Sequence, residues 1–280
     1  MRDYPALTLT WTRPVDAERV DLLLADLDGC GVTAVEELTD HAIRAFFTTA
    51  EARTHAADHL RSHADLAISA SEISDEDWGA RSQAAIGAVT VGALTIAPPW
   101  AAPSGARGDG LIIIQPSMGF GTGHHASTRL CLEHLQSVPL NGARVLDVGT
   151  GSGVLAIAAA RLGAAKVVGI DLDADALSNA SENAGLNGVS ERIDLRELTL
   201  VDARSLGRTF DVIVANLTGG HLRREASHLA PLAAPNAHLI VSGFQTDESN
   251  DVIHALESAG WTLSASAAEA TWVAALFTRL

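Results

Sequence analysis

Long apolar runs are missing from this sequence of 280 residues. A helix that crosses a membrane needs about 18 or more consecutive apolar residues, and no such run occurs, so we do not expect a membrane span. The N-terminal region carries acidic residues early, at Asp3, Asp16 and Glu18, and lacks the apolar segment of a signal peptide. We therefore expect a cytoplasmic protein rather than a secreted or membrane protein.

Cysteine is scarce too, with only Cys30 and Cys131, which lie far apart in the chain. They form no metal-ligand cluster, and we expect both to be core residues in a reducing compartment. His55, His59 and His63 would share one face of a helix, but no cysteine lies near them. We expect solvated histidines there and no metal site.

Positive charge is in short supply. The chain has 34 Asp and Glu residues against 19 Lys and Arg, a formal net charge of −15, and Lys166 is its single lysine. This balance disfavours unaided binding to nucleic-acid phosphates. It suits a basic protein partner, whose approach it would accelerate, although general solubility explains the same charge equally well.

The most informative stretch that is present is Val145–Gly153, which reads Val-Leu-Asp-Val-Gly-Thr-Gly-Ser-Gly. The apolar run that ends at Val148 predicts a buried strand, and the glycines predict a tight turn. The alanine-rich segment Val154–Leu162 then predicts a helix. Strand, glycine turn and helix form the first half of a nucleotide-binding unit, in which Gly149, Gly151 and Gly153 let the backbone approach a ligand closely.

Two residues of this motif indicate the class of nucleotide. The dinucleotide fingerprint requires glycine or alanine at position 154, where this chain has Val154, which disfavours an NAD oxidoreductase. Asp147 lies two residues before the first glycine. Its carboxylate would repel a pyrophosphate and attract an ammonium group. A nucleoside with an amino-acid tail fits better, and S-adenosylmethionine is such a ligand.

The following segments alternate between predicted strands and helices, which indicates an α/β fold with a doubly wound, mostly parallel sheet. Lys166–Asp171 and Phe210–Asn216 are predicted strands, and each ends in a polar residue. Ligands bind at the carboxyl ends of such strands. We expect Asp171 to accept the ribose hydroxyls, because Asp173 can cap the next helix.

The N-terminal part is predicted to be a separate small domain over residues 1–71. Its elements follow the order β-α-β-β-α-β, with the first helix over Asp16–Asp28 and the last strand over Leu66–Ala70, which is the ferredoxin-like pattern. We expect this domain to recognise the substrate. Residues 72–119 are predicted to be a linker with connecting strands, and residues 120–280 the catalytic domain.

Four landmarks resemble one known family. Phe120-Gly121-Thr122-Gly123, followed by His125 and Thr128, looks like its F-G-T-G-x-H-x-x-T loop. Val145–Gly153 is similar to its cofactor motif, Val168–Asp171 to its ribose strand and Val214–Leu217 to its V-A-N-[IL] loop. The family is that of the bacterial methyltransferases that modify ribosomal protein L-eleven (PrmA-like). They are class I enzymes with a Rossmann-like fold and S-adenosylmethionine as cofactor.

The resemblance implies cofactor contacts at Thr128, Gly149, Asp171 and Asn216, in addition to Asp147, Gly151 and Gly153 of the glycine motif. It implies methylation of lysine or N-terminal amines of a large-subunit ribosomal protein. In our hypothesis, the Asn216 amide and the Leu217 backbone carbonyl orient the acceptor amine, while Phe120 and Trp100 wall the pocket.

Departures from the family pattern keep alternatives open. His124 stands where threonine is usual, and Thr218 follows Leu217 where the family has leucine. The acceptor could therefore be another protein's lysine or a small amine, and a cofactor-binding regulatory protein is the alternative without catalysis. His124 or His125 could act as a general base, or the histidines could serve within their own loop. The sequence leaves the oligomeric state open.

Overall fold

The computed structural model describes residues 3–13, 23, 30–39, 41–61, 63, 65–74, 87–103, 110–116 and 123–279. The chain forms two compact units, Met1–Ala85 and Ile86–Leu280. None of the described helices is long and apolar enough to cross a membrane.

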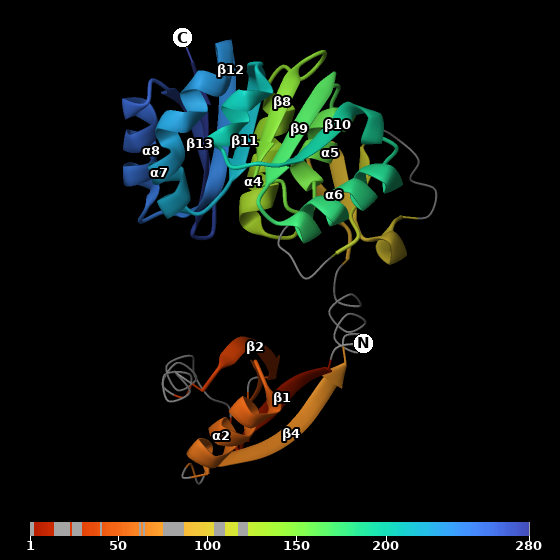
Figure 1. The fold of residues 1–280 in the computed structure, drawn as a ribbon, viewed down its shortest axis with the longest axis vertical. Coiled ribbons are helices and arrows are strands. Elements are labelled where there is room, and N and C mark those ends of the chain that lie inside the picture. The colour runs from red at the N-terminus through yellow and green to blue at the C-terminus, as the bar shows by residue number, and fades with distance from the viewer. Residues whose placement is uncertain are drawn as a thin grey trace. The chain divides into compact units, whose positions relative to one another are not determined.

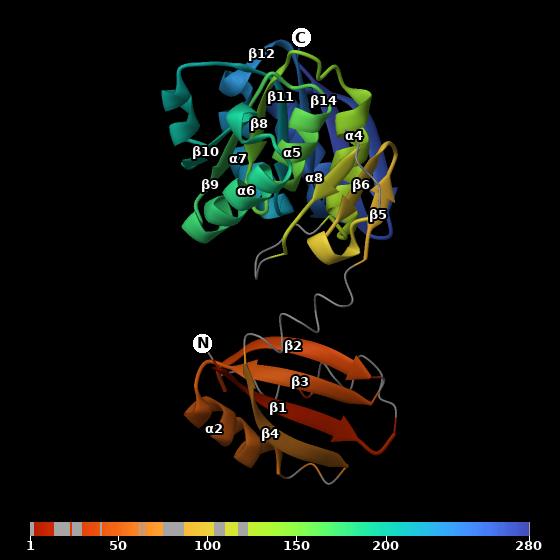
Figure 2. The ribbon, with the colours of Figure 1, turned by 90° about the vertical axis from the view of Figure 1, so that its right-hand side faces the viewer.

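The first unit contains a four-stranded sheet and one described helix. The elements are β1 (Asp3–Trp11), β2 (Val32–Thr39), β3 (Ala42–Phe47), α2 (Ala50–Leu60) and β4 (Leu66–Ser74). The strands lie in the order β2-β3-β1-β4 with antiparallel neighbours (Figure 2). This sheet agrees with the predicted ferredoxin-like arrangement. The predicted strand over Leu66–Ala70 continues to Ser74, because β4 pairs with β1 along its whole length.

Alternate side chains of this sheet form one apolar core with α2. Leu7, Leu9 and Ile43 point to this core, and Leu60 of α2 closes it. Thr49 caps the helix by accepting a hydrogen bond from Ala52 N at 3.1 Å. The predicted helix over Asp16–Asp28 lies outside the described residues except for Leu23, which is buried in the same core.

The second unit is a larger α/β structure (Figure 1). Its helices are α4 (Ala126–Ser137), α5 (Val154–Arg161), α6 (Ala174–Leu186), α7 (Gly219–Leu229) and α8 (Ser249–Ser258). Its strands are β5 (Val89–Val91), β6 (Leu94–Ala97), β7 (Leu111–Ile113), β8 (Arg144–Val148), β9 (Lys166–Asp171), β10 (Ile193–Glu197), β11 (Phe210–Asn216), β12 (Ala233–Gln245), β13 (Thr262–Glu269) and β14 (Trp272–Thr278). Short 3₁₀ helices cover Pro99–Ala101, Ser190–Arg192, Asp202–Leu206 and Ala230–Leu232.

Seven strands form the central sheet in the order β10-β9-β8-β11-β12-β14-β13. The first five are parallel, and β14 runs antiparallel to both of its neighbours. The order reverses between β8 and β11, because the chain passes from one half of the sheet to the other there. Such a switch point is where doubly wound sheets bind ligands. The predicted doubly wound, mostly parallel sheet is confirmed.

Both faces of the central sheet are covered, because successive strand residues point to opposite sides. Val145 and Val214 pack against α4 and α5, whereas Leu146 and Ile213 pack against α7 and α8. Cys131 of α4 is buried on the first face, and Cys30 is buried in the first unit, as predicted.

A separate three-stranded sheet, β5-β6-β7, occupies the segment predicted as linker with connecting strands. Its residues Leu94, Ile96 and Ile112 are fully or almost fully buried and belong to the same core as α4 and α5. These strands therefore stabilise the second unit, which begins at Ile86.

Candidate functional site

The glycine motif forms a loop between β8 and α5. Gly149, Gly151 and Gly153 have φ values of 70°, 53° and 80°, in the left-handed region that favours glycine. A Cβ atom at Gly149 would lie 2.6 Å from Cδ2 of Leu217, so the β11 loop packs directly on this glycine. Gly153 is the N-cap of α5. The loop therefore presents backbone where a side chain would not fit.

Asp147 lies beneath the glycine loop. Its side chain is 1% exposed, and Oδ2 accepts hydrogen bonds from Thr150 Oγ1 at 2.7 Å and Ala156 N at 3.1 Å. Burial raises the pKa of this carboxyl to about 7, and the nearby charge of Asp171 adds to the increase. These contacts support a role in shaping the loop. Its predicted contact with an ammonium group stays a prediction.

Asp171 is the last residue of β9, and its carboxylate bonds both to the glycine loop and to the residues that follow β9. Its Oδ2 accepts from Gly151 N at 2.9 Å, and Oδ1 accepts from Leu172 N at 2.8 Å and Asp173 N at 3.1 Å. An ionised carboxylate has about four acceptor positions, so these bonds leave capacity for a ribose hydroxyl. Asp173 caps α6 by accepting from Asp175 N, as predicted.

A cavity of about 400 Å³ opens at the carboxyl ends of the strands. Gly149, Asp171 and Leu217 line it together with apolar residues from the turns after β9 and β10. This volume lies within the range of about 300–1,000 Å³ that is typical of small-ligand sites. The remaining lining residues are Val148, Ile170, Leu172, Leu198, Thr199, Leu200, Val201, His221, Arg224 and Glu225.

Thr128 and Asn216, predicted separately as cofactor contacts, lie side by side. Asn216 Nδ2 donates a hydrogen bond to Thr128 Oγ1 at 3.3 Å. Thr128 is 1% exposed in the first turn of α4, and Asn216 is the last residue of β11. The structure therefore brings together the start of α4 and the end of β11.

The backbone of Leu217 is held by the neighbouring strand. Its N–H donates to Ser242 O at 2.9 Å. Its carbonyl oxygen would lie only 2.5 Å from a Cβ atom at Gly243, which would also lie 2.9 Å from Asn216 Oδ1. Gly243 has a φ of 92°, at a register shift between β12 and β14. Sequence reasoning missed Gly243, which lets Asn216 and Leu217 approach β12.

The two histidines before α4 have identifiable partners. His124 Nε2 lies 2.9 Å from the carbonyl oxygen of Gly87. His125 is the N-cap of α4, and its Nδ1 accepts from Ser127 N at 3.3 Å. The His125 ring also packs edge-on against Trp272, with ring centroids 4.4 Å apart. Both side chains thus serve contacts within the surrounding structure, which is the alternative to a general base.

The same histidine segment is anchored by an ion pair. Arg129 of α4 makes two hydrogen bonds to the Glu269 carboxylate of β13, one of them at 3.0 Å, and another to the His124 carbonyl. The pair raises the pKa of Arg129 and lowers that of Glu269. Burial, followed by the positive charge of Arg129, lowers the pKa of His125. The lowered pKa favours the neutral form of the His125 ring.

Phe120 and Trp100 are the two residues predicted to wall the acceptor pocket. Phe120 lies outside the described residues, so its role stays a prediction. Trp100 is described in the 3₁₀ helix after β6, where its side chain is 43% exposed.

No three His, Cys, Asp or Glu residues of the described ranges are grouped so that they could hold a metal ion. His55 and His59 are exposed, but the expectation that no cysteine lies near this group is wrong for His55, whose Nδ1 lies 3.7 Å from Cys30 Sγ.

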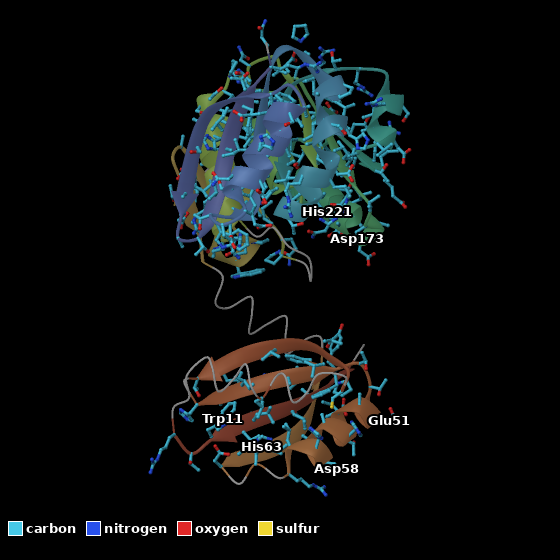
Figure 3. All side chains as sticks on the ribbon, turned by 90° about the vertical axis from the view of Figure 1, so that its left-hand side faces the viewer. Trp11, Glu51, Asp58, His63, Asp173 and His221 are labelled. Atoms are coloured by element: carbon cyan, nitrogen blue, oxygen red, sulfur yellow. The ribbon has the colours of Figure 1, made fainter. Side chains whose placement is uncertain are left out.

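Sequence reasoning also missed part of the cavity wall. Leu172 follows Asp171 and is 68% exposed, and Leu200 comes from the turn after β10. His221, near the start of α7, lies at the same end of the unit as Asp173 (Figure 3). An apolar residue directly after Asp171 was a usable signal for an apolar wall of the cavity. The contributions of Leu200 and His221 depend on chain folding and had no local signal.

The profile of the family described as "Ribosomal protein L11 methyltransferase (PrmA)" matches residues 18–279. The chain belongs to this family. It is 37% identical to the ribosomal protein L11 methyltransferase of Geobacter sulfurreducens over 285 aligned positions, which cover 92% of this chain and 93% of the relative. The same-named protein of Deinococcus radiodurans is 42% identical, with 68% of this chain and 71% of that protein covered.

A solved structure supports the same assignment. The ribosomal protein L11 methylase of Lactobacillus delbrueckii subsp. bulgaricus has a TM-score of 0.63 and 29% identity. The alignment covers 69% of this chain and 98% of that structure. The chain is thus an S-adenosylmethionine-dependent methyltransferase with a class I, Rossmann-like fold.

The residues present fit S-adenosylmethionine. The glycine loop has no room for a Cβ at Gly149, Asp171 offers carboxylate oxygens at the cavity wall, and Leu172 and Leu200 offer apolar surface. These are the features that a backbone-bound nucleoside with a ribose and a purine requires. When bound, this cofactor supplies an activated methyl group on a sulfonium.

Proposed function

We propose that this enzyme methylates amino groups, namely lysine side chains and the N-terminal amine, of ribosomal protein L11. The observation that carries the proposal is the Asn216–Thr128 hydrogen bond. It joins an amide, positioned at the end of β11, to the first turn of α4, the helix that follows the F-G-T-G segment. The relatives with this name support the choice of acceptor. We place the reaction in the cytoplasm, where ribosomes assemble.

The reaction requires the protein mainly to hold a neutral amine in line with the methyl group that is transferred. A free lysine has a pKa of about 10.4, so roughly one molecule in two thousand is neutral at pH 7. In this proposal, the exclusion of water around the amine disfavours its charged form and lowers its pKa. In this proposal, the Asn216 side chain and the Leu217 carbonyl orient the amine. Orientation and exclusion of water then supply most of the rate.

The test uses the purified enzyme, radiolabelled S-adenosylmethionine and recombinant L11 that carries no methyl groups. We expect label in L11, reduced when its lysines are replaced by arginine and its N-terminus is acetylated. A parallel reaction contains a cell extract depleted of methylated protein. Label in small molecules alone, or in a different protein with L11 unlabelled, would overturn the proposed acceptor. Retention of label in the lysine-free, acetylated L11 would overturn amine methylation.

We further propose that the first unit docks this basic substrate. Residues 1–71 contain twelve Asp and Glu residues and six Arg residues. Three of those arginines are already engaged, Arg44 with Glu36 at 2.9 Å, Arg53 with Glu72 at 2.6 Å and Arg61 with Asp58 at 3.1 Å. Glu51 and Asp58 lie exposed on α2 (Figure 3). Opposite charges attract over distances of about 10 Å at moderate salt, so these acids would favour association with a basic protein.

The docking proposal is tested with the double variant Glu51→Gln, Asp58→Asn. We expect a higher KM for L11 with an unchanged KM for S-adenosylmethionine, and a weaker salt dependence of the KM for L11. Neutralising Glu191 and Asp202 of the second unit by the same kind of substitution is the matched control. Equal KM values for L11 in the docking variant and the wild type would exclude α2 from docking.

A further inference from the structure

Three asparagines lie on one side of α6, at successive four-residue intervals. Asn179 and Asn183 belong to the helix, and Asn187 is its C-cap. Their side chains are 9%, 0% and 4% exposed. A buried amide without hydrogen-bond partners is costly, so each of these side chains needs a defined set of partners.

Most of those partners are backbone groups of β7 and the residues that follow it. Asn187 bonds reciprocally with Ile113, accepting from its N–H at 2.9 Å and donating to its carbonyl at 2.6 Å. Asn183 Oδ1 accepts from Gln115 N at 2.8 Å, and Asn179 Nδ2 donates to Gln115 O at 3.2 Å. The amides of α6 therefore replace a neighbouring strand along the edge of β7.

Asn183 has a second, different partner. Its Nδ2 donates to the carbonyl oxygen of Ser152 at 2.9 Å. Ser152 lies in the glycine loop, between Gly151, whose N–H is bonded to Asp171, and Gly153. One side chain thus connects the glycine loop to Gln115, from which the chain continues through Pro116 toward the F-G-T-G segment.

We infer that Asn183 is a positioning residue for the cofactor. Its amide sets the distance between the Ser152 carbonyl and the Gln115 N–H, and so holds the glycine loop in the conformation that binds S-adenosylmethionine. Asn187 makes the same kind of bonds to β7 but has no bond to the glycine loop. Variants at the two positions therefore distinguish a role in cofactor positioning from a role in supporting β7.

The test compares Asn183→Asp with Asn187→Asp by calorimetric titration of S-adenosylmethionine. Each change preserves shape and removes the N–H donors. In Asn183→Asp a carboxylate oxygen faces the Ser152 carbonyl, and we expect the Kd to rise at least about tenfold, the effect of an unsatisfied buried partner. In Asn187→Asp we expect a Kd within about twofold of wild type, because residue 187 does not contact the loop.

Thermal unfolding and circular dichroism establish that each variant is folded at the titration temperature. If an aspartate is not tolerated at either position, Asn183→Ala and Asn187→Ala provide the same comparison, since alanine favours the helix. A wild-type Kd in the Asn183 variant would overturn the inference. So would an equal rise in Kd for both positions, which would indicate general destabilisation.

Discussion

Asn216 Nδ2 donates a hydrogen bond to Thr128 Oγ1 at 3.3 Å, although 88 positions separate these residues in the chain. The bond joins the end of β11 to the first turn of α4. Since Leu217 lines the cavity next to Asn216, the bond fixes the polar end of the site relative to its apolar wall.

Replacing Asn216 tests its proposed role in orienting the amine. Asn216→Ala should lower kcat for methyl transfer at least about tenfold, because the oriented amide is lost at the reacting end of the site. Thr128→Val is the matched control, since it removes the hydroxyl partner but keeps the amide, and it should have a smaller effect. Steady-state kinetics with labelled cofactor give both values. Near-wild-type turnover in a folded Asn216→Ala enzyme would remove Asn216 from the mechanism.

Gly243 offers a test of the Leu217 carbonyl. In Gly243→Ala the new methyl group would press on Leu217 O and Asn216 Oδ1, so we expect kcat to fall by about tenfold or more. Gly260→Ala is the control, because Gly260 has a similar φ of 91° and a Cβ added there would meet no atom within 4 Å. Both changes carry the left-handed backbone cost of about 1–2 kcal/mol. Equal kcat in the two variants would contradict the proposed role.

Replacing Gly149 tests the binding of the cofactor rather than that of the acceptor. In Gly149→Ala the added carbon would meet Leu217 Cδ2 and displace either the loop or the cavity wall. We expect a rise in the Kd for S-adenosylmethionine of about tenfold or more, measured by calorimetry. Gly188→Ala, at a φ of 65° and with open space around the site, should lose similar stability and keep its Kd. Unchanged binding in Gly149→Ala would show that the loop tolerates a side chain.

The raised pKa of Asp147 predicts a specific pH dependence of the stability of the folded protein. Burial raises its pKa from an ordinary value near 3.8 to about 7, so the folded protein binds a proton that the unfolded chain releases between these values. The contribution of Asp147 to stability is therefore greatest below about pH 4 and declines as pH rises toward about 7. Urea unfolding of wild type and Asp147→Asn at several pH values measures it. The stability of wild type relative to the variant should fall across this range and then level off, and a flat difference would contradict the shift.

Much of the second unit could be predicted from local patterns. The run before Gly149 and the alternation of strands with helices are short-range signals, and they led to the parallel sheet and to the cofactor loop. The full extents of β12 and β13 are not encoded locally, because pairing with β14 carries β12 to Gln245 and β13 to Glu269. The small residues of β13 offer no clear apolar alternation that would reveal this pairing from sequence.

The residues of the site also differ in whether local sequence patterns reveal them. Gly149 and Asp171 could be recognised because their roles depend on a turn and a strand end that are encoded nearby. Asp147 is harder to interpret, since the sequence suggests a contact with the ligand while the structure places it beneath the loop, bonded to Thr150 and Ala156. Gly243 could not be recognised, because its neighbours come from another strand.

The sequence by itself determined the fold class, the methyl donor and the family, since glycine spacing, strand ends and short motifs are local features that chain chemistry constrains directly. Tertiary structure alone decided which distant residues meet. It paired Asn216 with Thr128, set Leu217 against Gly149, and gave Asn183 partners in both the glycine loop and the residues after β7. These contacts depend on the order of strands in the sheet, because only that order brings the loops at their carboxyl ends within hydrogen-bonding distance.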